Sequence, residues 1–275
     1  MSTNEEVFRA VVSALEQGQD AALVTIVKTS GSTPQRVGAK MLVYADGRTV
    51  GTIGGGCSES DATLKAREAL RSRRPQLARY ELNDDLAAES GLICGGQMEV
   101  YIEPLEPAAH LYLVGAGHIS AYLGRFAAQT GFHVHVLDDR ERFANRERFP
   151  EAEEILVDTI PDALLRIQWP ANSFLVIVTR GHRYDFDALR AVAGRPFRYI
   201  GMIGSRAKVK RVFDELGEKG CPADWLQQVR APIGLDIGAV TPAEIAVSIL
   251  AELVAARAGR LERIDALSMK SNARS

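Results

Sequence analysis

The spacing of apolar residues differs between the two parts of the chain. In the first part, Val7, Val11, Val12 and Leu15 recur at helical spacing and predict an amphipathic helix over residues 3–17. After it, the pattern predicts a strand at 21–29 and a hairpin at 39–53 that turns at Asp46-Gly47. A second helix is predicted at 58–74, and two further strands at 78–83 and 97–105. These elements predict a small mixed α/β domain.

From about residue 107 onward, strands and helices alternate regularly. The short apolar runs, several of them rich in β-branched residues, occupy 110–117, 132–139, 153–157, 173–179 and 197–204. Such alternation predicts a parallel sheet that is covered by helices on both faces. The proline-containing stretch 104–110 is a candidate linker. We therefore expect an α/β protein with a mixed N-terminal domain, 1–106, and a Rossmann-like C-terminal domain, 107–275.

Composition and charge narrow the class of protein. The chain has 275 residues, 46% hydrophobic content and a net charge of −2, which favours a globular protein and gives no field that attracts nucleic acid. The most apolar segment, 244–259, contains Glu244 and Glu252 and is too short to span a bilayer. The N-terminus has no signal-peptide pattern, and the three cysteines lack the spacing of a disulfide framework or zinc finger. We expect a cytoplasmic protein without a membrane span.

The C-terminal domain carries the pattern of a nucleotide-type site. Gly115 and Gly117 follow the first strand and precede a helix, Ser120 takes the place of the third glycine, and Asp138 ends the next strand. This order is compatible with NAD(P) or another nucleotide. His118 sits where a phosphate would lie at the helix start, and a solvated helix-end histidine is the equal alternative.

Further polar residues follow the fourth and fifth predicted strands. The ends of parallel strands share one edge of the sheet, where ligands bind. We therefore expect ligand contact from Arg180, His182, Ser205 and Arg206. The neighbouring basic residues Lys208, Lys210 and Arg211 are expected on a solvated helix face.

Two cysteines lie beside glycines in the N-terminal domain. Gly54, Gly55 and Gly56 run into Cys57 at a predicted helix start, where the helix dipole favours a thiolate. Cys94 precedes two further glycines. Either cysteine could contact a ligand, and the alternative is that both are small buried hydrophobic residues. Cys221 lies in a predicted turn and is interpreted as structural or incidental.

Long motifs make the chain similar to the XdhC/CoxI family, the accessory proteins of molybdenum hydroxylases. They include "GSTPQRVGAKMLV", "GTIGGGCSE", "GLICGGQMEVYIEP", "LVGAGHIS", "VHVLDDRERFANRERFP" and "YIGMIGSRAKVKRVFDEL". The resemblance implies a chaperone that binds the molybdenum cofactor (molybdopterin) and supports its sulfuration by a cysteine desulfurase. It also implies delivery to xanthine dehydrogenase or a related molybdenum hydroxylase. Cys57 or Cys94 would then lie near molybdenum, with no catalytic residues and no metal ligands otherwise assigned.

Two other functions remain open from the residues. An NAD(P)-dependent oxidoreductase is supported by the glycine motif, although no hydride-transfer residues accompany it. A protein–protein adaptor would not need the polar residues at the strand ends. The apolar helix predicted at 244–256 either covers the sheet, which we favour, or forms a homodimer.

Overall fold

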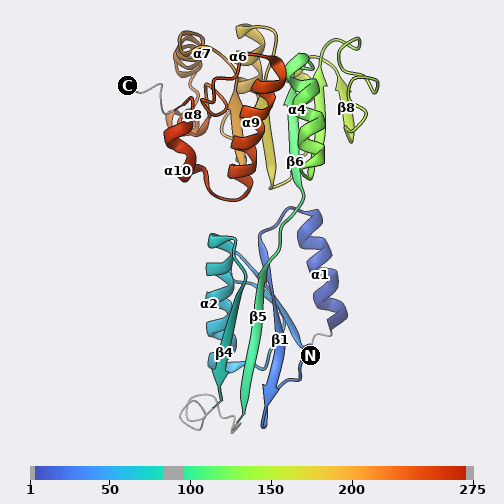
Figure 1. The fold of residues 1–275 in the computed structure, drawn as a ribbon, viewed down its shortest axis with the longest axis vertical. Coiled ribbons are helices and arrows are strands. Elements are labelled where there is room, and N and C mark those ends of the chain that lie inside the picture. Colours follow the sequence, from blue (N-terminus) through green and yellow to red (C-terminus); the bar gives the residue numbers. More distant parts are fainter. Residues whose placement is uncertain (1–3, 83–95, 271–275) are drawn as a thin grey trace. The chain divides into compact units, whose positions relative to one another are not determined.

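The computed structural model describes residues 4–82 and 96–270, and the chain divides into two compact units between Pro107 and Ala108. The first unit is built on an antiparallel sheet in the order β3-β2-β1-β5-β4. Its elements are α1 (Asn4–Glu16), β1 (Ala21–Ser30), β2 (Lys40–Tyr44), β3 (Thr49–Gly51), α2 (Gly56–Ser72), β4 (Gln76–Glu81) and β5 (Gln97–Pro104) (Figure 1).

Strand alternation distributes the apolar side chains of this unit between two helices. On β1, Ala22 and Val24 pack in the cluster that includes α2, whereas Ala21 packs in the cluster that includes α1. Successive strand residues face opposite sides, so α1 and α2 cover opposite faces of the sheet. The predicted helix at 3–17 and the hairpin at Asp46-Gly47 are confirmed. Of the apolar residues at helical spacing, Val12 is 53% exposed, whereas Val7 and Ala14 of the same helix are buried.

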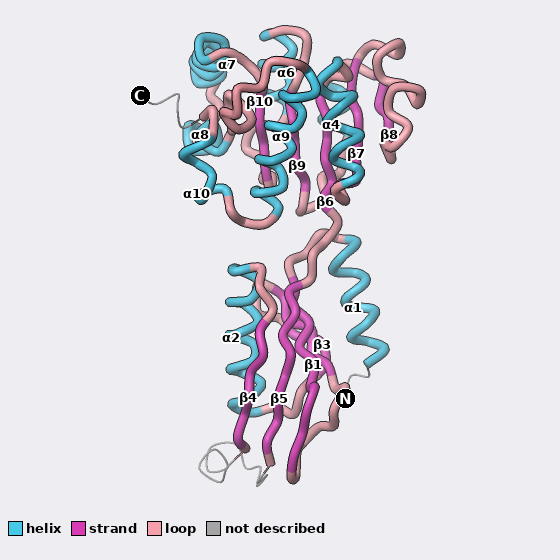
Figure 2. The backbone as a smooth tube through the Cα atoms, viewed as in Figure 1, coloured by secondary structure: helices cyan, strands magenta, loops and turns pink. Residues whose placement is uncertain are grey.

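The second unit is a doubly wound parallel sheet in the order β10-β9-β6-β7-β8. Its strands are β6 (Ala109–Val114), β7 (Phe132–Asp138), β8 (Glu154–Val157), β9 (Ser173–Ile177) and β10 (Tyr199–Met202). Its helices are α4 (His118–Gln129), α5 (Ile160–Arg166), α6 (His182–Ala191), α7 (Arg206–Glu218), α8 (Ala223–Gln228), α9 (Pro242–Arg257), α10 (Leu261–Ile264) and the 3₁₀ turn η1 (Asp265–Leu267) (Figure 2). The expected α/β fold with a Rossmann-like domain is confirmed.

Two hydrophobic clusters cover the two faces of this sheet. Leu111 and Leu113 of β6 pack with residues of α4 and α9, whereas Tyr112 and Val114 pack with residues of α5, α6 and α7. The order of the strands reverses between β6 and β9, which is the switch point at which open α/β sheets bind ligands. The helices that begin at this edge therefore position the candidate site.

Helix α9 covers the sheet, as favoured from its sequence. Ala246, Ile249 and Leu253 are fully buried in the cluster shared with α4 and the strands. Thr241 and Glu244 form a capping box that satisfies N–H groups at the helix start. A homodimer remains a prediction. Among residues 4–82 and 96–270, no helix is long and apolar enough to cross a membrane.

Candidate functional site

The two glycines of the loop between β6 and α4 are required for different reasons. Gly115 has φ +102°, and a Cβ there would lie 2.6 Å from the carbonyl oxygen of Val178. Gly117 has an ordinary φ of −73° and caps α4, and a Cβ there would meet nothing within 4 Å. Packing of β6 against the loop after β9 therefore demands glycine at 115. Nothing among the described residues demands it at 117, where the backbone stays open to a ligand.

Asp138 holds this glycine loop from the end of β7. Its carboxylate is 2% exposed and accepts the Ala116 N–H at 2.7 Å. The Arg140 guanidinium donates to the same carboxylate at 2.8 and 2.9 Å. Asp138, which the sequence analysis assigned to cofactor binding, is thus already hydrogen-bonded to Ala116 and Arg140. Its contact with a ribose remains a prediction.

An arginine-rich segment after β7 lies against the glycine loop. Arg148 donates to the Ala116 carbonyl at 3.3 Å and approaches the Gly117 carbonyl at 3.5 Å. Its buried Nε has no hydrogen-bond partner among the described residues. The guanidinium carbons of Arg140 and Arg148 lie 4.0 and 5.2 Å from the Phe143 ring centre, at cation–π distance. The sequence reasoning missed these two arginines, although the run of arginines directly after a strand was a usable signal.

The expected site residue Arg180 joins the end of β9 to the end of β7. Its two terminal nitrogens donate to the Asp139 carboxylate at 2.6 and 2.7 Å, and its guanidinium lies over the Tyr184 ring. This bidentate pair holds the pKa of Asp139 below its usual value. His118 and His182, the first residues of α4 and α6, are both exposed.

A buried ion pair connects the next two loops. Asp185 is 0% exposed, accepts the Thr179 hydroxyl at 2.6 Å and pairs with Lys208 of α7. Burial raises the pKa of Asp185, and the hydrogen bonds from Lys208 and Thr179 oppose that rise. The expectation that Lys208 lies on a solvated helix face is wrong, because the first turn of α7 faces α6.

The remaining two expected residues start α7. Ser205 is the N-cap, and its hydroxyl oxygen accepts the Lys208 N–H at 3.3 Å. Arg206 is exposed and borders a cavity of about 550 Å³ whose lining includes Lys210 and Phe213. Ser205 therefore caps its own helix, and the Arg206 side chain remains accessible to solvent.

This edge of the sheet is suited to an anion. Helices α4, α6 and α7 all begin at the carboxyl ends of parallel strands, and unpaired N–H groups with a positive dipole end favour negative charge at such positions. Arg148 adds a cationic side chain beside the glycine loop, and Arg180, paired with Asp139, follows β9. The arrangement can hold a phosphate-bearing ligand over the switch point.

The glycine run of the N-terminal unit folds around an internal carboxylate. Gly54, Gly55 and Gly56 have φ of +131°, +79° and +66°, which side chains rarely allow. Glu59 Oε2 accepts the Gly55 N–H at 2.9 Å and the Thr52 hydroxyl at 2.6 Å. The run therefore has a local conformational reason, and the Gly55 N–H is already occupied.

The cysteines have different surroundings. Cys57 is exposed in the first turn of α2, so the predicted helix start is confirmed there. Cys94 lies outside the described residues. Cys221 is half-buried and packs against the hydrophobic cluster beneath α7, and burial raises the pKa of its thiol. This environment fits a structural role for Cys221.

Replacing Glu59 by glutamine is expected to loosen the turn that presents Cys57. The neutral amide loses the charge-assisted hydrogen bonds, so the opening free energy of the α2 amides should fall by about 1–2 kcal/mol. Hydrogen exchange of the full chain measures it. Glu68→Gln, on an exposed position of the same helix, should change it by less than about 0.5 kcal/mol. Equal effects of the two variants would contradict the role of Glu59.

Comparison with known proteins assigns the family. The XdhC Rossmann domain matches residues 111–253, and the XdhC and CoxI family matches residues 14–81. The chain belongs to the XdhC and CoxI family. The resemblance drawn from the sequence motifs is thereby confirmed, and the matched Rossmann domain contains the glycine loop and the strand ends described above.

Individual relatives extend this comparison. The uncharacterized protein YqeB of Escherichia coli is 35% identical over 90% of this chain, and the chain spans 46% of the length of YqeB. The molybdenum cofactor insertion chaperone PaoD of Escherichia coli is 26% identical over 91% of this chain and 88% of its own length. A solved xanthine dehydrogenase structure from Bacillus halodurans is 26% identical with a TM-score of 0.50, covering 99% of this chain and 100% of that one. Family membership and the chaperone relative favour an accessory protein over an enzyme.

Proposed function

We propose that this XdhC family protein binds the molybdenum cofactor and acts as a maturation chaperone for a xanthine dehydrogenase-type molybdenum hydroxylase. The observation that carries the proposal is the carboxyl edge of the Rossmann sheet, where three helices begin at the ends of parallel strands and Arg148 lies against the glycine loop. The name of the relative PaoD supports the cargo, and the likeness to the Bacillus halodurans xanthine dehydrogenase structure supports the class of client enzyme.

The chemistry of the cofactor fits the residues at this edge. The pterin carries a phosphate, which the start of α4 can bind through backbone N–H groups. Gly117 leaves room for a close approach of the ligand to the backbone. The Arg148 side chain, with its buried Nε still lacking a partner among the described residues, lies directly beside the loop. His118, His182 and Arg206 are exposed and can add contacts from the outer side of the edge.

Considered by itself, the N-terminal unit offers one soft donor, the Cys57 thiol, in this proposal. Thiolates are preferred partners of soft, sulfur-bound metals. The Gly54–Gly56 turn and Glu59 hold Cys57 exposed at the first turn of α2, accessible to a cofactor or to a cysteine desulfurase. Support of sulfuration and delivery to the hydroxylase are parts of the proposal that rest on the family, and the role of Cys94 remains a prediction.

The test is retention of the cofactor by the purified full chain. The protein is mixed anaerobically with cofactor released from a molybdoenzyme, separated by gel filtration, and assayed for molybdenum and pterin fluorescence. NAD(H) is run in parallel. We expect about one cofactor per chain and no retained NAD(H). Cys57→Ser should reduce retained molybdenum, whereas Cys221→Ser, at the half-buried position, should not.

The other outcomes are equally informative. Retention of NAD(H) without molybdenum would overturn the proposal in favour of the oxidoreductase, and retention of neither would favour an adaptor. An accompanying assay adds loaded protein and cysteine desulfurase to the apo-hydroxylase. Failure to activate it, with the cofactor retained, would contradict delivery but leave cofactor binding intact.

A further inference from the structure

Three of the five histidines of the chain gather on two adjacent strands, away from the carboxyl edge of the sheet. His110 is the second residue of β6, and His133 and His135 are the second and fourth residues of β7. His110 pairs with His133 in the parallel register, and side chains two residues apart on a strand share one face. The register therefore places all three imidazoles on the same face of the sheet.

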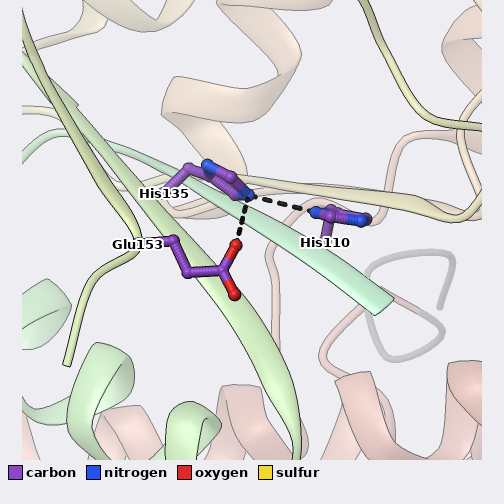
Figure 3. Close-up of side chains that lie close together, drawn as sticks. All are labelled: His110, His135 and Glu153. Carbon is purple, nitrogen blue, oxygen red and sulfur yellow. Dashed lines mark hydrogen bonds and ion pairs between the residues drawn. The ribbon is translucent and has the colours of Figure 1, made fainter. Parts of the chain in front are cut away.

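Glu153, immediately before β8, completes this cluster. The Nδ1 atom of His110 and the Nε2 atom of His135 are 3.1 Å apart, and Nε2 of His135 lies 3.9 Å from a carboxylate oxygen of Glu153 (Figure 3). One ligand atom from each of these three residues lies within 4.8 Å of the others. Two imidazoles and a carboxylate converging on one point form a donor set that zinc and similar divalent ions accept.

The buried member of the cluster is already oriented. His135 is 8% exposed and stacks on Tyr112 with ring centres 4.5 Å apart. Its buried Nδ1 has no hydrogen-bond partner among the described residues and faces the Glu154 carboxylate at 3.5 Å. A histidine that turns one nitrogen to a carboxylate and presents the other to a shared point matches the carboxylate–histidine–metal arrangement.

The access from solvent also suits an ion. Glu153 is held by His133 through its other oxygen, and its side chain is 47% exposed. An ion at this point would therefore reach solvent on the Glu153 side, where water can supply a fourth ligand.

We propose that His110, His135 and Glu153 bind one divalent transition-metal ion of the zinc type, with Glu154 orienting His135 from behind. The ion would tie together β6, β7 and the start of β8 near the amino ends of the first two strands. It is distinct from the cysteine and glycine-loop residues that we assign to the molybdenum cofactor, so the two proposals stand or fall separately.

Zinc titration of the full chain, stripped of metal with a chelator, tests the site. Calorimetry should give one Zn²⁺ per chain, and a Co²⁺-loaded sample should show visible absorption bands of a low-coordinate site. His135→Ala and Glu153→Gln should abolish both signals. Glu154→Gln, which removes only the orienting charge, should weaken zinc binding by about 10–100-fold.

The matched control is His118→Ala, which removes an exposed histidine outside the cluster. It should leave stoichiometry and affinity for zinc unchanged. Circular dichroism of the metal-free variants checks the fold, and Glu153→Gln, at a half-exposed side chain, keeps the test available where His135→Ala fails to fold. Absence of zinc binding in the unmodified chain, or its persistence in Glu153→Gln, would overturn the proposal.

Discussion

Replacing Glu252 by alanine is expected to lower the free energy of unfolding of the Rossmann domain by about 3–5 kcal/mol. The Glu252 carboxylate is 0% exposed in α9 and pairs with Arg230 at 2.7 Å. It also accepts the Tyr199 hydroxyl at 2.9 Å and the Gly234 N–H at 2.6 Å. Removal leaves these donors buried without their acceptor, including the charged Arg230, which retains only its second partner Asp265.

Denaturant unfolding followed by tryptophan fluorescence measures this effect. The two tryptophans, Trp169 and Trp225, both lie in the second unit, so the signal reports on the Rossmann domain. Glu215→Ala, on an exposed position of α7, should change stability by no more than about 0.5 kcal/mol. A loss below about 1 kcal/mol in Glu252→Ala would show that the network contributes little.

The second large effect separates the two glycines of the β6–α4 loop. Gly115→Ala should destabilise the domain by about 3 kcal/mol, because the new Cβ meets the Val178 carbonyl at a positive φ. Gly117→Ala should cost less than about 1 kcal/mol, since its φ is ordinary and the space is open. We nevertheless expect Gly117→Ala to reduce molybdenum cofactor affinity at least about tenfold, or about 1.4 kcal/mol, by blocking the approach of the ligand.

Gel-filtration retention and tryptophan-detected unfolding of the same samples distinguish the two roles. In the expected pattern, Gly117→Ala is nearly as stable as the unmodified protein but retains little cofactor. Unchanged retention in Gly117→Ala would place the ligand elsewhere and contradict the proposed edge. A stability loss in Gly117→Ala as large as that in Gly115→Ala would contradict the open-backbone argument.

The elements were predictable because their signals are local. The helical spacing of Val7 and Val11 and the Asp46-Gly47 turn are each signals that span only a few residues. The strand–helix rhythm of the second half predicted the parallel sheet for the same reason, and Gly115 marked its first loop. Helical spacing alone did not show that Val12 lies at the exposed edge of the apolar stripe, because spacing does not decide which edge faces the sheet.

The partners of the site residues were not predictable, because they are distant in sequence. Arg180 pairs with Asp139 across 41 positions, and Arg148 reaches the Ala116 carbonyl across 32. Whether an N–H group is free for a ligand depends on such contacts. Glu59 and Asp138 fill N–H groups at Gly55 and Ala116 that a glycine motif alone would leave available.

The sequence by itself determined the two-part α/β organisation, the glycine loop and the family motifs, since each depends on the order and spacing of neighbouring residues. Only the tertiary structure decided which polar groups are occupied, why Glu252 stands in an apolar helix and where the histidines meet. His110 and His135 are 25 positions apart and become neighbours through the pairing register of β6 and β7. Hydrogen bonds and metal coordination act over a few ångströms of space, whatever the distance along the chain.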